Sequence, residues 1–227
     1  MGRDIAVVLD KMKKHKHFLV LLYYIIIYLL YYYTEKITKP KYFMYSRLDD
    51  YIPFIKYMVI PYLFWYVYIV MALIYLGFNS KEDFYKLTFF MFTGMTICFI
   101  IYLTFPNGQN LRPVIVENDF FSNLIRNIYI KDTPTNSAPS MHVVDSIAVH
   151  KSIIKCDKLK NKKWLHISSR IVMLSIIAST VMIKQHSILD VLYGIGLSLI
   201  LYFVIYKLNV LQYLNVKKLV FLTDDNN

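Results

Sequence analysis

The chain has 227 residues, of which 57% are hydrophobic, and this excludes an ordinary soluble domain, in which roughly 45 to 50% of residues are apolar. Lys and Arg (26) outnumber Asp and Glu (15), and in so apolar a chain a net charge of +11 indicates membrane topology rather than nucleic acid binding. The two cysteines, Cys98 and Cys156, provide neither a disulfide framework nor a cysteine metal cluster.

Apolar runs recur along the chain at a length close to that of a membrane span. They cover about Phe18–Tyr33, Tyr57–Gly77, Leu87–Phe105, Met141–Ile154, Ile171–Ile183 and Ile188–Tyr206. Six spans of roughly 20 residues would use most of the hydrophobic residues. The sequence therefore predicts an all-α polytopic membrane protein. Residues 1–227 would form a single six-transmembrane-helix bundle, with residues 1–17 as a basic N-terminus.

The fourth run is the weakest of the six because it contains polar side chains. His142, Asp145, Ser146 and His150 are spaced so that they share one helical face. Polar groups at membrane depth are costly, so this face is expected to point into the bundle.

The basic residues predict which ends of the spans face the cytoplasm. If the N-terminus is inside, 17 Lys and Arg residues lie on the cytoplasmic side and 9 on the outer side. The positive-inside rule then places both termini in the cytoplasm of a multi-pass cell-membrane protein. The loop 106–140, the turn 184–187 and the segment 34–56 would face outward, and the last could contain a short interfacial helix or a re-entrant piece.

Three polar clusters fall at the predicted outer ends of spans. His186 and Asp190 are four residues apart, so the carboxylate can orient one imidazole and leave its second nitrogen as a nucleophile or base. His142 begins the fourth span, where free backbone N–H groups favour an anion. Arg112 provides a planar fork of donors suited to phosphate. Two histidines around an anion site suggest phosphoryl transfer through a phosphohistidine.

The remaining histidines are given no part in this site. His150 lies about two turns deeper than His142 and is expected to make a hydrogen bond in the core. His15, His17 and His166 fall in basic segments and are expected to be solvated.

These clusters resemble the type 2 phosphatidic acid phosphatase (lipid phosphate phosphatase) superfamily. Its pattern is Lys-x6-Arg-Pro, then Pro-Ser-Gly-His, then Ser-Arg-x5-His-x3-Asp, and the similarity covers a catalytic core over residues 87–206. The resemblance implies that His186 is the nucleophile, Asp190 its orienting carboxylate and His142 the general acid. It also implies that Arg112 and Ser140 bind the phosphate.

The chain departs from the family pattern at three positions. Phe105 stands where the first motif has Lys, Met141 where the second has Gly, and Thr180 where the third has Arg. Lys184, two residues before His186, is the expected replacement for one cation, and Lys131 is a second candidate. The departures suggest either a divergent branch, such as the one similar to inositol phosphorylceramide and sphingomyelin synthases, or a reduced activity.

The predicted function is that of a metal-independent enzyme without a cofactor. It would cleave a phosphomonoester or diphosphate of a phospholipid or isoprenoid at the extracytoplasmic side of the bilayer. One alternative is a phosphotransferase of the inositol phosphorylceramide or sphingomyelin synthase type. Others are a non-catalytic lipid-binding protein, or a haem protein that uses His142, His150 and His186 as ligands.

Overall fold

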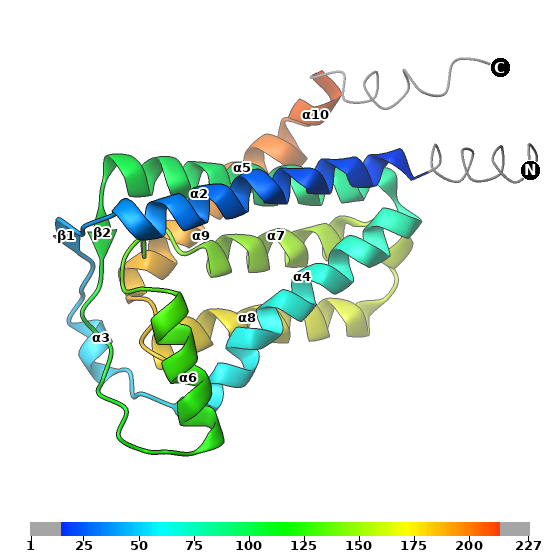
Figure 1. Ribbon diagram of the computed structural model, residues 1–227. Helices are drawn as coiled ribbons and strands as arrows, with labels where there is room; N and C mark the ends of the chain where they lie inside the picture. Colours follow the sequence, from blue (N-terminus) through cyan, green and yellow to red (C-terminus); the bar gives the residue numbers. More distant parts are fainter. Residues whose placement is uncertain (1–14, 214–227) are drawn as a thin grey trace, which may run out of the picture.

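The computed structural model describes residues 15–213, which form an elongated helical bundle (Figure 1). The all-α prediction is confirmed, apart from two short paired strands. The elements are η1 Lys16–Leu22, α2 Tyr23–Ile37, β1 Tyr42–Phe43, α3 Leu48–Tyr51, η2 Lys56–Met58, α4 Val59–Asn79, α5 Lys81–Thr104, β2 Asn107–Gly108, α6 Phe120–Lys131, α7 Met141–Lys155, η3 Asp157–Leu159, α8 Lys163–Met182, α9 Ile188–Tyr202, η4 Phe203–Lys207 and α10 Val210–Tyr213.

Five helical segments of the described residues are long and apolar enough to cross a membrane. They are Lys16–Ile37, Lys56–Asn79, Lys81–Thr104, Lys163–Met182 and Ile188–Lys207. The run predicted as the fourth span forms α7, which has only 15 residues. At 1.5 Å per residue α7 is about 22 Å long, shorter than a hydrocarbon core of roughly 30 Å. The predicted number of six spans is therefore not confirmed.

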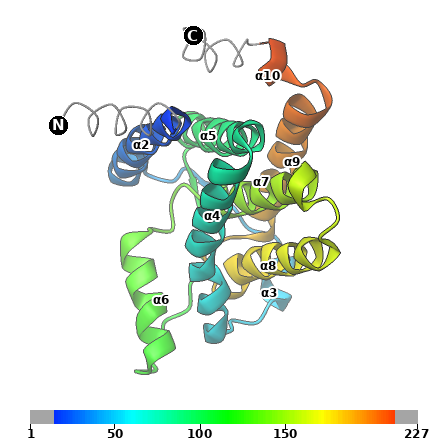
Figure 2. The ribbon, with the colours of Figure 1, turned by 90° about the vertical axis from the view of Figure 1, so that its right-hand side faces the viewer.

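Helix α7 lies at the centre of the bundle. It packs between α5 and α8 and also contacts α4 and α9 (Figure 2). Asp145 and Ser146 are fully buried, but so are Val143, Val144 and Ala148 on the apolar face. Neighbouring helices thus enclose α7 on all sides, which is how its polar residues are kept away from lipid.

Local sequence explains where α5 begins. The helix starts at Lys81, six residues before the predicted apolar run, because Ser80 caps it and accepts a hydrogen bond from the Asp83 backbone N–H (3.3 Å). Glu82 and Lys86 then pair at i and i+4, with 2.8 Å between charged atoms. The polar residues 81–86 therefore form the first turns of the helix.

Strands β1 and β2 and helices α3 and α6 lie at one end of the bundle, beside the turn between α8 and α9 (Figure 1). Strands β1 and β2 pair in parallel, with Tyr42 opposite Asn107. Helix α3 matches the short helix expected within residues 34–56. At the other end Val20 and Leu211 line one apolar groove, so the first and last described helices meet there.

Two features differ from the sequence-based expectations. The loop 106–140 contains an amphipathic helix, α6, which begins after the capping residue Asp119 and packs Ile125 against the start of α4 and the end of α8. His17 is buried rather than solvated, and its Nε2 lies 2.7 Å from the carbonyl oxygen of Gly77. As expected, His150 makes a core hydrogen bond, to Ser169 Oγ (2.9 Å).

Candidate active site

The two histidines of the predicted site lie together near one end of α7. The ring centroids of His142 and His186 are 5.8 Å apart, although 44 positions separate them in the chain. His186 belongs to the turn that leads into α9, and its Nδ1 lies 3.2 Å from Asp190 Oδ2. Asp190 is fully buried, and its Oδ2 also accepts the Ser187 backbone N–H (2.9 Å). The carboxylate therefore fixes the His186 ring and leaves Nε2 as the free nitrogen.

His142 is held in a different way. Its ring packs against Tyr62 and Trp65 of α4, with ring centroids 4.5 and 4.4 Å away. Its Nε2 is buried and has no hydrogen-bond partner among the described residues. A buried ring nitrogen without a partner is costly, so this atom is suited to a group that a ligand brings.

Both histidines line a cavity of about 740 Å³. The cavity follows α2 from Tyr24 to Glu35, eleven positions or roughly 16 Å along the helix axis. Its apolar walls come from α2, α4, α5, α6 and α7 and include Ile27, Leu63, Met95, Phe99, Leu124 and Ile128. Six tyrosines also line it: Tyr24, Tyr28, Tyr31, Tyr62, Tyr66 and Tyr102. The cavity is therefore a long, mostly apolar slot with the histidines near one end.

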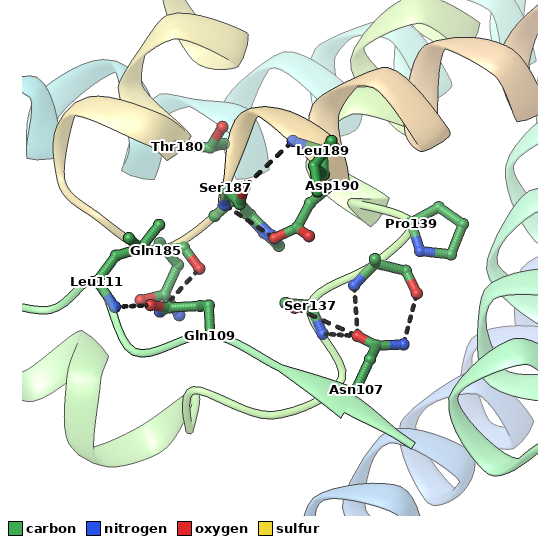
Figure 3. A network of polar contacts seen from close by, with 12 residues as sticks. Asn107, Gln109, Leu111, Ser137, Pro139, Thr180, Gln185, Ser187, Leu189 and Asp190 are labelled. Carbon is green, nitrogen blue, oxygen red and sulfur yellow. Dashed lines mark hydrogen bonds and ion pairs between the residues drawn. The ribbon is translucent and has the colours of Figure 1, made fainter. Parts of the chain in front are cut away.

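Two buried amides join the predicted motifs to each other (Figure 3). Asn107 Oδ1 accepts the backbone N–H groups of Ser137 (2.9 Å) and Ala138 (2.8 Å), just before α7. Gln109 Nε2 donates to the carbonyl oxygens of Lys184 (3.1 Å) and Gln185 (3.3 Å), just before His186. Both side chains are fully buried. The segment around β2, residues 107–109, therefore sets how the start of α7, which holds His142, lies relative to the turn that holds His186.

Arg112 supports the wall of the site and does not line the cavity. Its guanidinium donates to the carbonyl oxygens of Tyr129 (2.9 Å) and Asp132 (2.5 Å) and to Gln185 Oε1 (2.9 Å). Burial lowers the pKa of Arg112, and the Asp132 carboxylate opposes that shift. The group stays cationic, because arginine is not deprotonated in proteins. Arg112 thus places a positive charge one residue away from His186.

Ser140 links the two histidine turns through the backbone. Its N–H donates to the Asp190 carbonyl oxygen (3.1 Å), and its buried Oγ has no partner among the described residues. Helix α9 can approach this closely because it has Gly194, where an added Cβ would lie 3.0 Å from the Ser140 carbonyl oxygen. Among the described residues, buried atoms of Arg112 (Nε) and Asp190 (Oδ1) also have no partner, so several polar atoms around the predicted site are available to a ligand.

Lys184 lies beside the histidines in the chain but points elsewhere. Its Nζ donates to the carbonyl oxygens of Asp49 (2.7 Å) and Ile52 (2.6 Å), and the residue does not line the cavity. To act as a phosphate ligand it would have to leave both carbonyls. Phe105 stacks on Tyr42, and the Thr180 hydroxyl bonds within its own helix, so neither side chain supplies a polar group to the site. The Thr180 carbonyl oxygen does accept the backbone N–H of His186 (3.0 Å). Lys131, in contrast, does line the cavity.

Searches of family models, curated proteins and solved structures found no match to this chain.

Sequence reasoning missed several contributions to this site. Asn107 and Gln109 carry no catalytic motif, and their signal is only a polar run, Asn107–Asn110, between an apolar segment and Arg112. Helices α2 and α4 lie outside the predicted core 87–206, yet they form much of the cavity wall. Tyr62 and Trp65 could not be assigned from the sequence, because aromatic residues are frequent throughout the first three apolar runs of this chain.

Proposed function

We propose that the protein is an integral-membrane lipid phosphate phosphatase that acts through a phosphohistidine on His186. The observation that carries the proposal is the facing pair of histidines in one cavity, with His186 fixed by the buried Asp190 and His142 presenting an unpartnered Nε2. One ring is arranged as an oriented nucleophile and the other as a proton donor.

In the first step His186 Nε2 attacks phosphorus in line, and an N–P bond forms as the P–O bond to the leaving group breaks. His142 gives its proton to the departing oxygen. Water then attacks the phosphohistidine, its proton passes to His142, and cleavage of the N–P bond releases inorganic phosphate. Both imidazoles return to their starting state.

Three groups would stabilise the phosphoryl oxygens. The first backbone N–H groups of α7, from Met141 to Val143, have no partner within the helix and point toward its N-terminal end. Arg112 adds positive charge close to the His186 turn. Lys131 is the cation that lines the cavity itself, so it replaces Lys184 as the expected direct ligand.

The shape of the cavity supports a lipid as substrate. A water-soluble phosphate ester would occupy only the polar end of the cavity. The slot, however, continues for roughly 16 Å along α2 between apolar walls. We infer that the phosphate lies at the histidines and the hydrocarbon chain in the slot. In this proposal α7 is a sixth membrane pass, sheltered by its neighbours, and the site faces away from the cytoplasm, which holds both termini.

A lipid phosphotransferase is the second candidate, and the polar wall near the histidines favours it. Asn127, Asn136, Glu35 and Asp132 all line this cavity. Amide and carboxylate groups can bind hydroxyls, so an acceptor alcohol could take the place of water in the second step.

Turnover assays on the purified full-length protein in detergent test both candidates. We expect phosphate release from at least one of phosphatidic acid, phosphatidylglycerol phosphate and undecaprenyl diphosphate. Activity should survive EDTA and be blocked by vanadate, which mimics five-coordinate phosphorus. Transfer to an added diacylglycerol, ceramide or inositol in preference to water would identify the phosphotransferase. Activity that is lost on chelation and restored by a divalent ion would contradict the histidine mechanism.

A further inference from the structure

A second carboxylate lies at the start of α9, and it comes from a distant part of the chain. Asp49, in the four-residue helix α3, is only 2% exposed. Its Oδ1 accepts the backbone N–H of Ile188 (2.8 Å), and its Oδ2 accepts the hydroxyl of Ser187 (2.6 Å) and the backbone N–H of Ser46 (2.8 Å). The residue thus joins the segment before α4 to the turn that contains His186.

These contacts divide the capping of α9 between two carboxylates. Asp190 Oδ2 accepts the Ser187 N–H, Asp49 Oδ1 accepts the Ile188 N–H, and Ser187 Oγ accepts the Leu189 N–H (3.2 Å). The backbone N–H groups of Ile188 and Leu189, at the start of α9, therefore have acceptors other than Asp190. As a result, Asp190 Oδ2 can hold Ser187 and the His186 ring at the same time.

The same segment is fastened on its other side by Lys184. Its ammonium reaches the carbonyl oxygens of Asp49 and Ile52, so contacts from residues 49–52 bracket His186 on both sides. Lys184 itself has a positive φ of 55°, an uncommon backbone state that needs support from its surroundings. The turn is thus held from outside the predicted core 87–206.

We propose that Asp49 is a positioning residue for the nucleophile, an inference that rests on the proposed function of His186. Its carboxylate fixes Ser187 and Ile188, these residues fix Asp190, and Asp190 fixes the imidazole. Displacement of a reacting group by about 1 Å can cost on the order of 100-fold in rate. Loss of the Asp49 contacts should therefore slow the chemical step more than it weakens substrate binding.

The substitution Asp49→Asn tests this with little change in shape. The amide keeps one oxygen for the Ile188 N–H, but its NH2 group cannot accept the Ser187 hydroxyl hydrogen. We expect kcat to fall on the order of 10- to 100-fold, with KM within about threefold of wild type and an equal loss in the rate of phosphoenzyme formation. A kcat within twofold of wild type, or a change in KM alone, would overturn the proposal.

Asp50→Asn is the matched control. Asp50 is the exposed neighbour of Asp49, and among the described residues its side chain accepts only the Tyr45 hydroxyl (2.5 Å). This variant should keep the wild-type kcat. If both variants lost kcat equally, any change of charge in α3 would have the same effect, and the proposal would be wrong. If Asp49→Asn does not fold, Ser187→Ala and Ser187→Thr separate loss and retention of the hydroxyl that Asp49 accepts. Only the Ala variant should lose kcat, and equal rates would overturn the proposal.

Hydrogen exchange gives a readout that does not depend on turnover. In Asp49→Asn the amides of Ser187 and Ile188 should exchange faster than in wild type, whereas Asp50→Asn should leave them unchanged. If wild-type protein released no phosphate from any substrate, the proposed function would fail, while faster exchange would still show that Asp49 holds the turn. Unchanged exchange together with an unchanged kcat in an active enzyme would overturn the role of Asp49 alone.

Discussion

His142 and His186 differ in what holds their rings, and the proposed mechanism gives them different roles for this reason. The ring of His186 is tied through Nδ1 to Asp190, whereas that of His142 packs against Tyr62 and Trp65, and its buried Nε2 has no partner in the part of the chain that the structure describes. A nucleophile needs a fixed direction of attack, and a proton donor needs a nitrogen that no protein group occupies.

Replacing each histidine should therefore produce a different defect. We expect His186→Ala to abolish turnover and the labelled phosphoenzyme with every substrate. His142→Ala should slow lipid phosphates by on the order of 100- to 10,000-fold but aryl phosphates with good leaving groups much less, because those need no proton. Rates for a series of leaving groups measure this difference. Equal losses for His142→Ala across the series would show that it does not protonate the leaving group.

At the scale of elements, short connections bring the parts of the site together. The segment around β2 contacts both the residues just before α7 and the turn that holds His186. It also lies so close to the loop after α6 that only glycine fits at position 108. An added Cβ there would be 2.5 Å from the Pro134 carbonyl oxygen and 2.8 Å from Pro40 Cγ.

Gly108→Ala should consequently destabilise the protein. We expect the free energy of unfolding in detergent to fall by about 1 to 3 kcal/mol, the usual cost of overpacking, with a parallel loss of activity. Gly196→Ala is the control, because its Cβ would meet no atom within 4 Å and alanine favours a helix. Similar stability of Gly108→Ala and wild type would mean that the segment around β2 can move away from Pro134.

Helix α6 depends on a capping carboxylate that also reaches Lys56 at the start of η2. The Lys56 hydrogen bond (2.8 Å), followed by that of Ser122, lowers the pKa of Asp119. A lowered pKa in the folded state gives stability above the unfolded value of about 3.9, and this stability is lost as the pH falls through the folded value.

The amides at the start of α6 should therefore lose protection from hydrogen exchange below about pH 4. Asp119→Asn should remove this pH dependence. Glu117→Gln should preserve it, because Glu117 also pairs with Lys56 but does not cap the helix. A response of the same size in Asp119→Asn and wild type would assign the pH dependence to another group.

For the whole molecule, the arrangement of helices determines which loops share a side. The His186 turn, α3 and α6 lie at one end of the bundle, and the loop between α7 and α8 lies at the other (Figure 1). The distribution of basic residues predicts that the site end faces outward.

Cysteine labelling of intact cells tests this orientation. Cys98 and Cys156 are both buried, so introduced thiols are the accessible ones. Asn123→Cys, on the exposed face of α6, should react with an impermeant reagent from outside, and Asn161→Cys should react only after the membrane is opened. The reverse pattern would place the site in the cytoplasm.

The sequence by itself determined the helical class, the apolar segments and the residues His142, His186 and Asp190 as a group. The class and the segments follow from composition and hydrophobic length, and the spacing of four pairs Asp190 with His186. His142 joined them because it falls at the same predicted end of the bundle. The sequence also predicted an interior position for the polar face of α7. It also bounded α7 closely, because Ser140 precedes the apolar run Met141–Ile154 and Asp157 and Lys158 follow it, so the run was already shorter than most of the others.

Only the tertiary structure decided which groups complete the site. Asp49, Asn107 and Gln109 contact the histidine turns from segments that no local pattern connects with them, since a buried amide or carboxylate takes its role from its distant partners. The direction of Lys184 was decided in the same way, because the carbonyl oxygens of Asp49 and Ile52 lie within its reach. Spacing in the chain identifies residues that can act together on one helix, but contacts between helices determine which of them do.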